Sequence, residues 1–141
     1  MQAIIKIVGT QTVDDQTDSV ELTTTGTMEK TDEGWKLCYE ESEATGLQGT
    51  TTTVHIGKDR VLLERAGSNA SFLVLEKHKR HHSNYNTPYG ALDLGTYATA
   101  IEHSLTATGG EVYFAYTLGF NASVNSEHTV RITVQEDKEH V

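Results

Sequence analysis

Residues 111–120 read EVYFAYTLGF, and this stretch shows most clearly the pattern that decides the fold. Every second position carries a large apolar or aromatic side chain: Val112, Phe114, Tyr116, Leu118 and Phe120. Successive side chains of a β-strand point to opposite faces, so a period of two is typical of a strand with one buried face. We therefore expect a half-buried strand here.

The same period of two recurs along the rest of the chain. The runs are rich in Thr, Val, Ile and Tyr, which suit a pleated sheet. No segment has the apolar spacing of an amphipathic helix. The alternation predicts an all-β protein of eight to ten strands, in runs near 2–8, 18–30, 35–42, 50–57, 60–66, 71–82, 90–107, 111–121 and 127–135.

Short turn sequences separate many of these runs, such as TDEG at 31–34 and TGG at 108–110. Connections this short join antiparallel neighbours, which predicts an up-and-down meander. A long meander with one apolar face closes most simply into a barrel, because closure removes exposed strand edges. We expect one β-barrel domain over residues 1–141. The apolar phase changes between Ala98 and Ile101, which predicts a β-bulge.

The composition narrows the class of partner. The chain has 141 residues, with 20 Asp and Glu against 11 Lys and Arg, for a net charge of −9. Nucleic-acid binding draws on a dense basic surface, so we expect no nucleic-acid partner. No apolar run is long enough for a membrane span or a signal peptide, and the single cysteine allows no internal disulfide. These features predict a cytoplasmic protein with no membrane partner, and they leave the oligomeric state open.

Several short motifs, taken in their order and spacing, resemble a known family. The stretch WKLCYEESEATGLQGTTTTVHIGKDRVLLERAG at 35–67 is followed by TPYGALDLGTYATAI and GGEVYFAYTLGF. The matching positions are Tyr39-x-Glu41, Arg65-x-Gly67, Tyr89-Gly90, Leu92 with Leu94, and Tyr116. The chain resembles the YwiB-like family of small bacterial proteins. That resemblance implies a calycin-like (lipocalin-like) β-barrel and a domain of unknown function.

The run EKHKRHHSNYNTPYG at 76–90 concentrates basic residues in an acidic chain. His78 and His82 would lie on one face of a strand but roughly 13 Å apart, which is too far for one metal ion. The basic side chains alternate between the two faces, which is a poor arrangement for a phosphate groove. We interpret Lys77–His82 as a solvated strand end, with an anion patch as the alternative. Tyr89-Gly90, after the only proline, is expected to form a sharp entry into the next strand.

No sequence pattern for catalysis is present. The chain lacks a nucleophile elbow, a His-Glu-x-x-His helix and a phosphate-binding loop. Cys38 faces away from Trp35 and Leu37 in the predicted strand and has only Lys36 beside it, so it does not have the electropositive setting of a reactive thiol. We expect no catalytic residue, no metal and no cofactor, and therefore a protein that is not an enzyme.

The most informative polar residues are two charges that share the phase of core positions. Glu41 continues the phase of Leu37 and Tyr39, and Arg65 continues that of Leu63. An isolated inward charge costs several kcal/mol, so the pattern predicts that the two approach each other, directly or through one bridging group. The alternative is that Arg65 stands alone and anchors a ligand carboxylate or phosphate.

Two functions remain open at this point. One is a binding module for a small, partly apolar ligand in or at the mouth of the barrel. Its predicted ligand-binding residues are Glu41, Arg65, Tyr39, Tyr89 and Tyr116. The other is a packed structural or protein-interaction barrel without a small-molecule ligand. Bulky inward side chains leave both open, because an eight-stranded barrel is just wide enough to be filled or to hold one small molecule.

Overall fold

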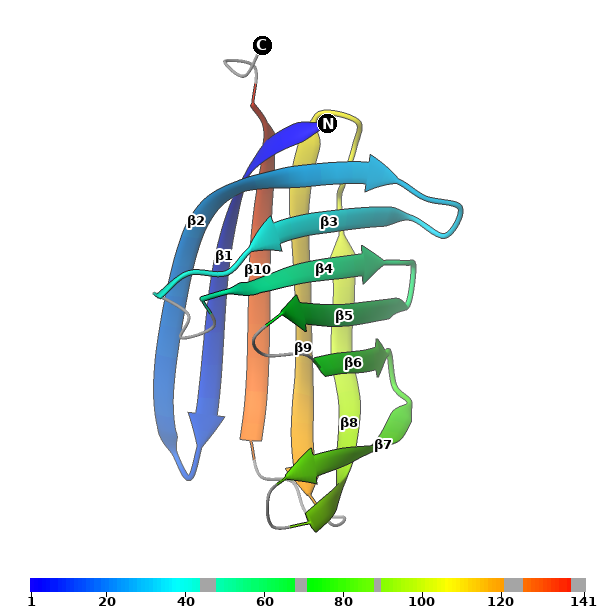
Figure 1. Cartoon of the computed structure of the whole chain (residues 1–141). Coiled ribbons are helices and arrows are strands. Elements are labelled where there is room, and N and C mark those ends of the chain that lie inside the picture. Colours follow the sequence, from blue (N-terminus) through cyan, green and yellow to red (C-terminus); the bar gives the residue numbers. More distant parts are fainter. Residues whose placement is uncertain (44–47, 68–70, 88–89, 121–125, 138–141) are drawn as a thin grey trace.

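The structure is a computed structural model that describes residues 1–43, 48–67, 71–87, 90–120 and 126–137 (Figure 1). These residues form ten strands and confirm the all-β prediction. No helix in the described ranges is long and apolar enough to cross a bilayer. The strands are β1 Gln2–Val13, β2 Gln16–Lys30, β3 Trp35–Glu40, β4 Thr50–Ile56, β5 Arg60–Gly67, β6 Ser71–Glu76, β7 Arg80–Thr87, β8 Gly90–His103, β9 Gly109–Phe120 and β10 Ser126–Glu136.

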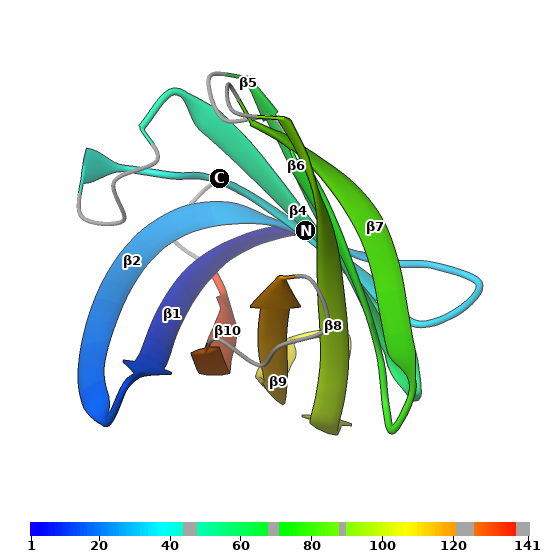
Figure 2. The ribbon, with the colours of Figure 1, turned by 90° about the horizontal axis from the view of Figure 1, so that it is seen from below.

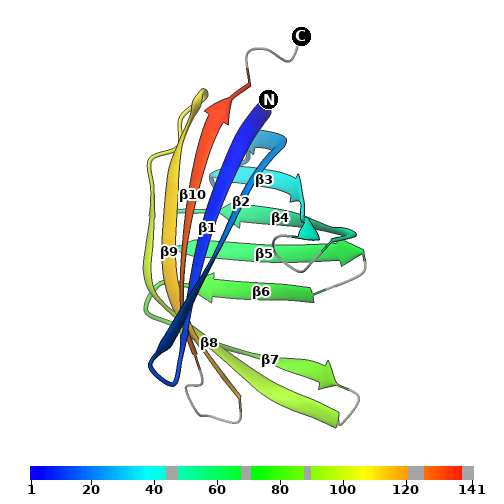
Figure 3. The ribbon, with the colours of Figure 1, turned by 90° about the vertical axis from the view of Figure 1, so that its left-hand side faces the viewer.

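All ten strands belong to one antiparallel sheet in the order β6-β5-β4-β3-β2-β1-β10-β9-β8-β7. Consecutive strands are therefore neighbours, as the predicted meander requires, and β1 also pairs with β10. The sheet coils into a nearly closed barrel whose two halves cross. β3 to β6 run across β1, β8, β9 and β10 at a steep angle (Figures 1 and 3). Seen from below, the strands curve around a common interior (Figure 2).

β2 connects the two halves by bending sharply in its second half (Figure 1). It pairs with β1 as far as Thr27, while its pairing with β3 begins at Gly26. At this corner the neighbouring strand comes so close that a Cβ on Gly26 would collide with the carbonyl oxygen of Cys38. A glycine is required here because only a residue without a side chain lets the two backbones approach this closely.

Among the described residues, no continuous ladder joins β6 to β7. The barrel closes instead where the turn between these two strands contacts β8. The backbone N–H of His78 donates to the Ala98 carbonyl at 2.9 Å, and the Thr96 hydroxyl donates to the Val74 carbonyl at 2.8 Å. β8 contacts the turn beside a register shift between Ala98 and Ala100, which confirms the predicted bulge. We call the border of β6 with β7 and β8 the seam. β6 and β7 diverge along it (Figure 3).

The segment predicted as one strand over 71–82 is instead a hairpin. β6 ends at Glu76, and Lys77–Lys79 make the turn, with His78 at a φ of +60°. The alternation in this run stops at Leu75, but the turn contains neither glycine nor proline, so the usual signal was missing. Of the sharp entry predicted at Tyr89-Gly90, only Gly90 is described, and it begins β8 opposite Thr87, the last residue of β7. Pro88 and Tyr89 lie outside the described residues.

The core fills one end of the barrel interior. Phe114 and Leu37 are fully buried, and Ile5 packs with them in the same cluster. Their strand neighbours on the opposite face are more exposed, as the period of two predicts. The largest of the described side chains that are less than 2% exposed are Phe114, Ile5, Leu37, Ile56, Leu75, Ile132, Val54, Val61, Val112, Thr50 and Thr52.

Candidate ligand cavity

A cavity of about 190 Å³ lies beside the packed core, between the two halves of the sheet. Most of its wall is apolar, with contributions from β1, β2, β3, β4, β5, β9 and β10. The barrel is therefore neither fully packed nor hollow. The lining residues are Ile7, Gly9, Val20, Leu22, Tyr39, Glu41, Val54, Leu63, Arg65, Phe114, Tyr116, Val130 and Ile132.

Four of the five residues predicted as a ligand site line this one cavity: Tyr39, Glu41, Arg65 and Tyr116. The fifth, Tyr89, lies outside the described residues. Three different strands and the segment after β3 supply these four polar groups. Their common direction follows from strand phase, because each stands an even number of positions from a fully buried residue of its own strand or run.

Glu41 is held in place by the strand next to it. Its side chain is 9% exposed, and its backbone N–H donates to the Thr50 carbonyl at 2.9 Å. The hydroxyl of the fully buried Thr52 donates to Glu41 Oε1 at 2.9 Å. The carboxylate therefore has a fixed position in the cavity wall.

Arg65 is half-buried and forms no direct ion pair with Glu41, so of the two predicted arrangements, direct contact or one bridging group, the direct one is absent. Thr52 stands opposite Arg65 in the β4–β5 register and binds Glu41 itself. Within the described part of the chain, no carboxylate oxygen lies within 4.0 Å of an Arg65 nitrogen. The buried Nε of Arg65 also has no hydrogen-bond partner among these residues. A buried donor without an acceptor costs about 1–3 kcal/mol, so the group is poised to gain from an added acceptor.

Two tyrosines complete the polar part of the wall. Burial, and then the negative charge of Glu41, raise the pKa of Tyr39 far above its ordinary value. Burial also raises the pKa of Tyr116, and the nearby positive charge of Arg65 opposes that rise. Both phenols stay protonated at neutral pH. The Tyr39 phenol is already hydrogen-bonded to the Glu41 side chain, so Tyr116 is the phenol that can donate to a bound acceptor.

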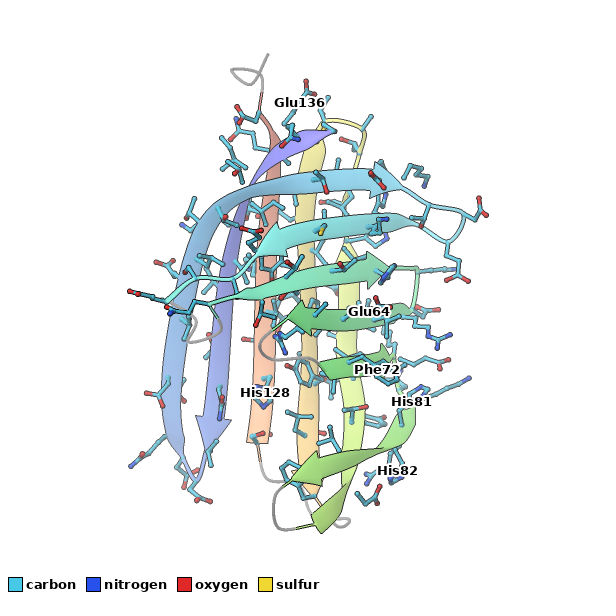
Figure 4. The ribbon with its side chains drawn as sticks, in the orientation of Figure 1. Glu64, Phe72, His81, His82, His128 and Glu136 are labelled. Carbon is cyan, nitrogen blue, oxygen red and sulfur yellow. The ribbon has the colours of Figure 1, made fainter. Side chains whose placement is uncertain are left out.

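His128 adjoins the cavity and was not singled out from the sequence. Its ring stacks on Tyr116 with centroids 4.9 Å apart and planes 6° apart, and its Nε2 is hydrogen-bonded to the Ser126 hydroxyl at 2.7 Å. It lies toward the start of β10 (Figure 4). The available signal was strand phase, because His128 lies on the same face of its strand as the inward residues Val130 and Ile132. Burial lowers its pKa below the usual 6.5.

The lowered pKa of His128 predicts a pH-dependent stability. Since the unfolded chain takes up the proton more readily, this histidine destabilises the fold as pH falls below about 6.5. We expect His128→Gln to lose less free energy of unfolding between pH 7.5 and pH 5.0 than the native chain, measured by urea denaturation. His103→Gln, at an exposed position, should keep the native pH dependence. Equal pH dependence in the native chain and His128→Gln would contradict the assignment.

The basic run lies at the outer side of the seam, away from the cavity (Figure 4). Lys79 and His81 contact Glu76 at 3.1 and 3.0 Å, and His82 contacts Asp93 at 3.3 Å. The ion pairs with Lys79 and His81 lower the pKa of Glu76. No group of three or more metal-binding side chains gathers anywhere in the described ranges. These contacts join β6 to β7 and β7 to β8.

Comparison with known proteins identifies the fold and gives no activity. A family model described as Domain of unknown function (DUF1934) matches residues 5–132. The crystal structure of ywiB protein from Bacillus subtilis superimposes with a TM-score of 0.82 at 20% identity, covering 97% of this chain and 92% of that one. Among curated proteins none matches. The resemblance to the YwiB-like family is confirmed.

Proposed function

Because the chain belongs to the family described as Domain of unknown function (DUF1934), which supplies no activity, we propose its function from the cavity. The proposal is a non-enzymatic, cytoplasmic binding protein that holds a small, partly apolar molecule. The apolar body of the ligand lies in the cavity, and its anionic group binds Arg65.

The observation that carries the proposal is the buried Nε of Arg65, which has no partner among the described residues, in a wall that is otherwise mostly apolar. A guanidinium presents its donors in a fork that matches a carboxylate or phosphate. An anionic ligand group would supply the missing acceptor, and the protonated phenol of Tyr116 would add a donor beside it. Charges inside the cavity are screened less than charges on the surface, so the interaction between Arg65 and an anionic group is stronger there.

The cavity volume limits the size of the ligand. An apolar protein cavity of about 150 Å³ holds benzene, so about 190 Å³ suits one ring or a short branched chain with a polar group. The long acyl chains and polycyclic ligands of larger β-barrels would not fit without rearrangement of the wall. The proposed ligand is thus a small metabolite.

Native mass spectrometry of protein purified from its own host tests the proposal. We expect a defined added mass that denaturation releases, and we expect the same molecule to raise the unfolding temperature. A ligand at about 100 times its Kd stabilises the native state by about 2.7 kcal/mol. Arg65→Gln should reduce the bound fraction at least tenfold. Arg60→Gln, which removes a charge from an exposed position of the same strand, should leave it unchanged.

A second variant tests the cavity without changing a charge. A Cβ on Gly9 would meet nothing within 4 Å, and Gly9 lines the cavity. Gly9→Val should therefore fold and yet exclude the ligand. A clean apo mass, with no thermal shift across a panel of small carboxylates and other metabolites, would reject the binding protein. It would leave the packed structural or protein-interaction barrel as the function.

A further inference from the structure

The cavity wall carries two opposite charges that do not pair with each other. Glu41 and Arg65 both line it, and no ion pair within 4.0 Å joins them. Oppositely charged groups in one small cavity normally gain by contact, because poorly screened charges attract strongly. Their separation therefore needs a reason, and the β3–β4–β5 ladder supplies one.

The ladder fixes the backbone positions from which the Glu41 and Arg65 side chains extend. Tyr39, Thr52 and Arg65 stand opposite one another on three adjacent strands. Glu41 bonds back to this row through the Thr52 hydroxyl and through its own backbone N–H. Glu41 follows β3 and Arg65 is on β5, so the two residues are rooted two strand spacings apart, roughly 10 Å at about 4.8 Å per spacing. Both side chains line the same cavity, so a small molecule held there can contact both. The Glu41 carboxylate has about four acceptor positions and can accept further donors.

This arrangement favours a ligand that carries both charges. A simple carboxylate bound at Arg65 is attracted by the guanidinium and repelled by Glu41. A simple amine is attracted by Glu41 and repelled by the guanidinium of Arg65. A molecule with an ammonium beside a carboxylate meets an opposite charge at each end and leaves neither protein group unpaired. Specificity of this kind combines an attractive contact with a repulsive one against the wrong ligand.

We propose that the cavity binds a free α-amino acid with an apolar side chain, with its carboxylate on Arg65 and its ammonium on Glu41. The inference rests on the proposed function and names its ligand class. The remaining wall is mostly apolar, with Leu22, Leu63 and Val130 among its residues. The volume fits one branched or aromatic side chain, as in leucine or phenylalanine.

Calorimetric titration with matched ligands tests the inference. L-leucine is compared with 4-methylpentanoate, which lacks the ammonium, and with 3-methylbutylamine, which lacks the carboxylate. L-phenylalanine, 3-phenylpropanoate and phenethylamine form a second series with a larger side chain. In at least one series we expect the amino acid to bind at least tenfold more tightly than either analogue. This comparison uses the native chain throughout, so it does not depend on the folding of a variant.

An isosteric substitution then assigns the ammonium site. Glu41→Gln should lose the preference for the amino acid and bind the matching carboxylate at least as well as the native chain does. Glu43→Gln, which removes a charge from an exposed residue nearby, should keep the native preference. Far-UV circular dichroism and cooperative thermal unfolding confirm that both variants are folded.

The outcomes separate this inference from the function on which it rests. Equal or tighter binding of the carboxylate would overturn the amino-acid inference and keep the anionic anchor at Arg65. A native ligand that lacks an ammonium would overturn it in the same way. No binding in either series, together with a clean apo mass from the host, would reject both.

Discussion

Phe114→Ala is expected to lower the free energy of unfolding by about 3–5 kcal/mol. Phe114 is 0% exposed, belongs to the main core cluster and also lines the cavity. Removing its ring takes away buried apolar area and also joins a new void to the existing cavity, so the wall has few atoms with which to collapse. Urea denaturation followed by tryptophan fluorescence measures the loss.

Phe72→Ala is the matched control, because Phe72 is 59% exposed on β6. It should change stability by no more than about 0.5 kcal/mol, as is usual for surface positions. If the two variants lost similar free energy, the core would not be where the structure places it. Phe114→Leu should recover much of the loss, since it refills most of the removed volume.

Gly26→Ala is expected to cost about 3 kcal/mol, the upper end of what overpacking usually costs. The added methyl group would collide with the Cys38 carbonyl and come close to the Ile5 side chain. A side chain can rotate away, but the carbonyl belongs to the ladder between β2 and β3 and cannot move without breaking it. The strand would have to straighten where it passes from one half of the barrel to the other.

Gly9→Ala is the control for Gly26→Ala, because the same methyl group at Gly9 meets nothing within 4 Å. It should be neutral or slightly stabilising, since alanine restricts the unfolded chain more than glycine does. Thermal unfolding of the two variants, side by side, measures the difference. Equal stability of both would mean that β2 does not turn its corner at Gly26.

The alternation of side chains predicted most of the fold because burial on one face of a strand leaves a direct trace in the sequence. The strand around Phe114 and the bulge after Ala98 follow from this alternation, and the meander follows from the short turns between the runs. The turn at Lys77–Lys79 is not predicted by the alternation, because it depends on a positive φ at His78 that the residue type does not indicate. How the barrel closes depends on contacts between strands far apart in sequence, which no local pattern records.

The sequence predicts which side chains of the candidate site point to the interior, but it does not predict how far apart they lie. Strand phase shows that Glu41 and Arg65 point to the interior, because the pleat sets the face on which a side chain stands. It does not show that Thr52 stands between them and binds the carboxylate. From cost alone the two charges are predicted to meet directly or through one bridging group, and the structure has no direct ion pair between them. His128 was passed over because a histidine in an apolar phase resembles an ordinary core residue.

The pairing of β1 with β10 has a consequence for the order of synthesis. Ala3 stands opposite Glu136, and the Asp137 backbone N–H donates to the Gln2 carbonyl at 3.0 Å. Every other ladder joins strands that follow one another along the chain. On the ribosome the hairpins from β1 to β9 can thus form as they emerge. β1 keeps one backbone edge open until β10 is released, so among the strands of this barrel it waits longest for its second neighbour.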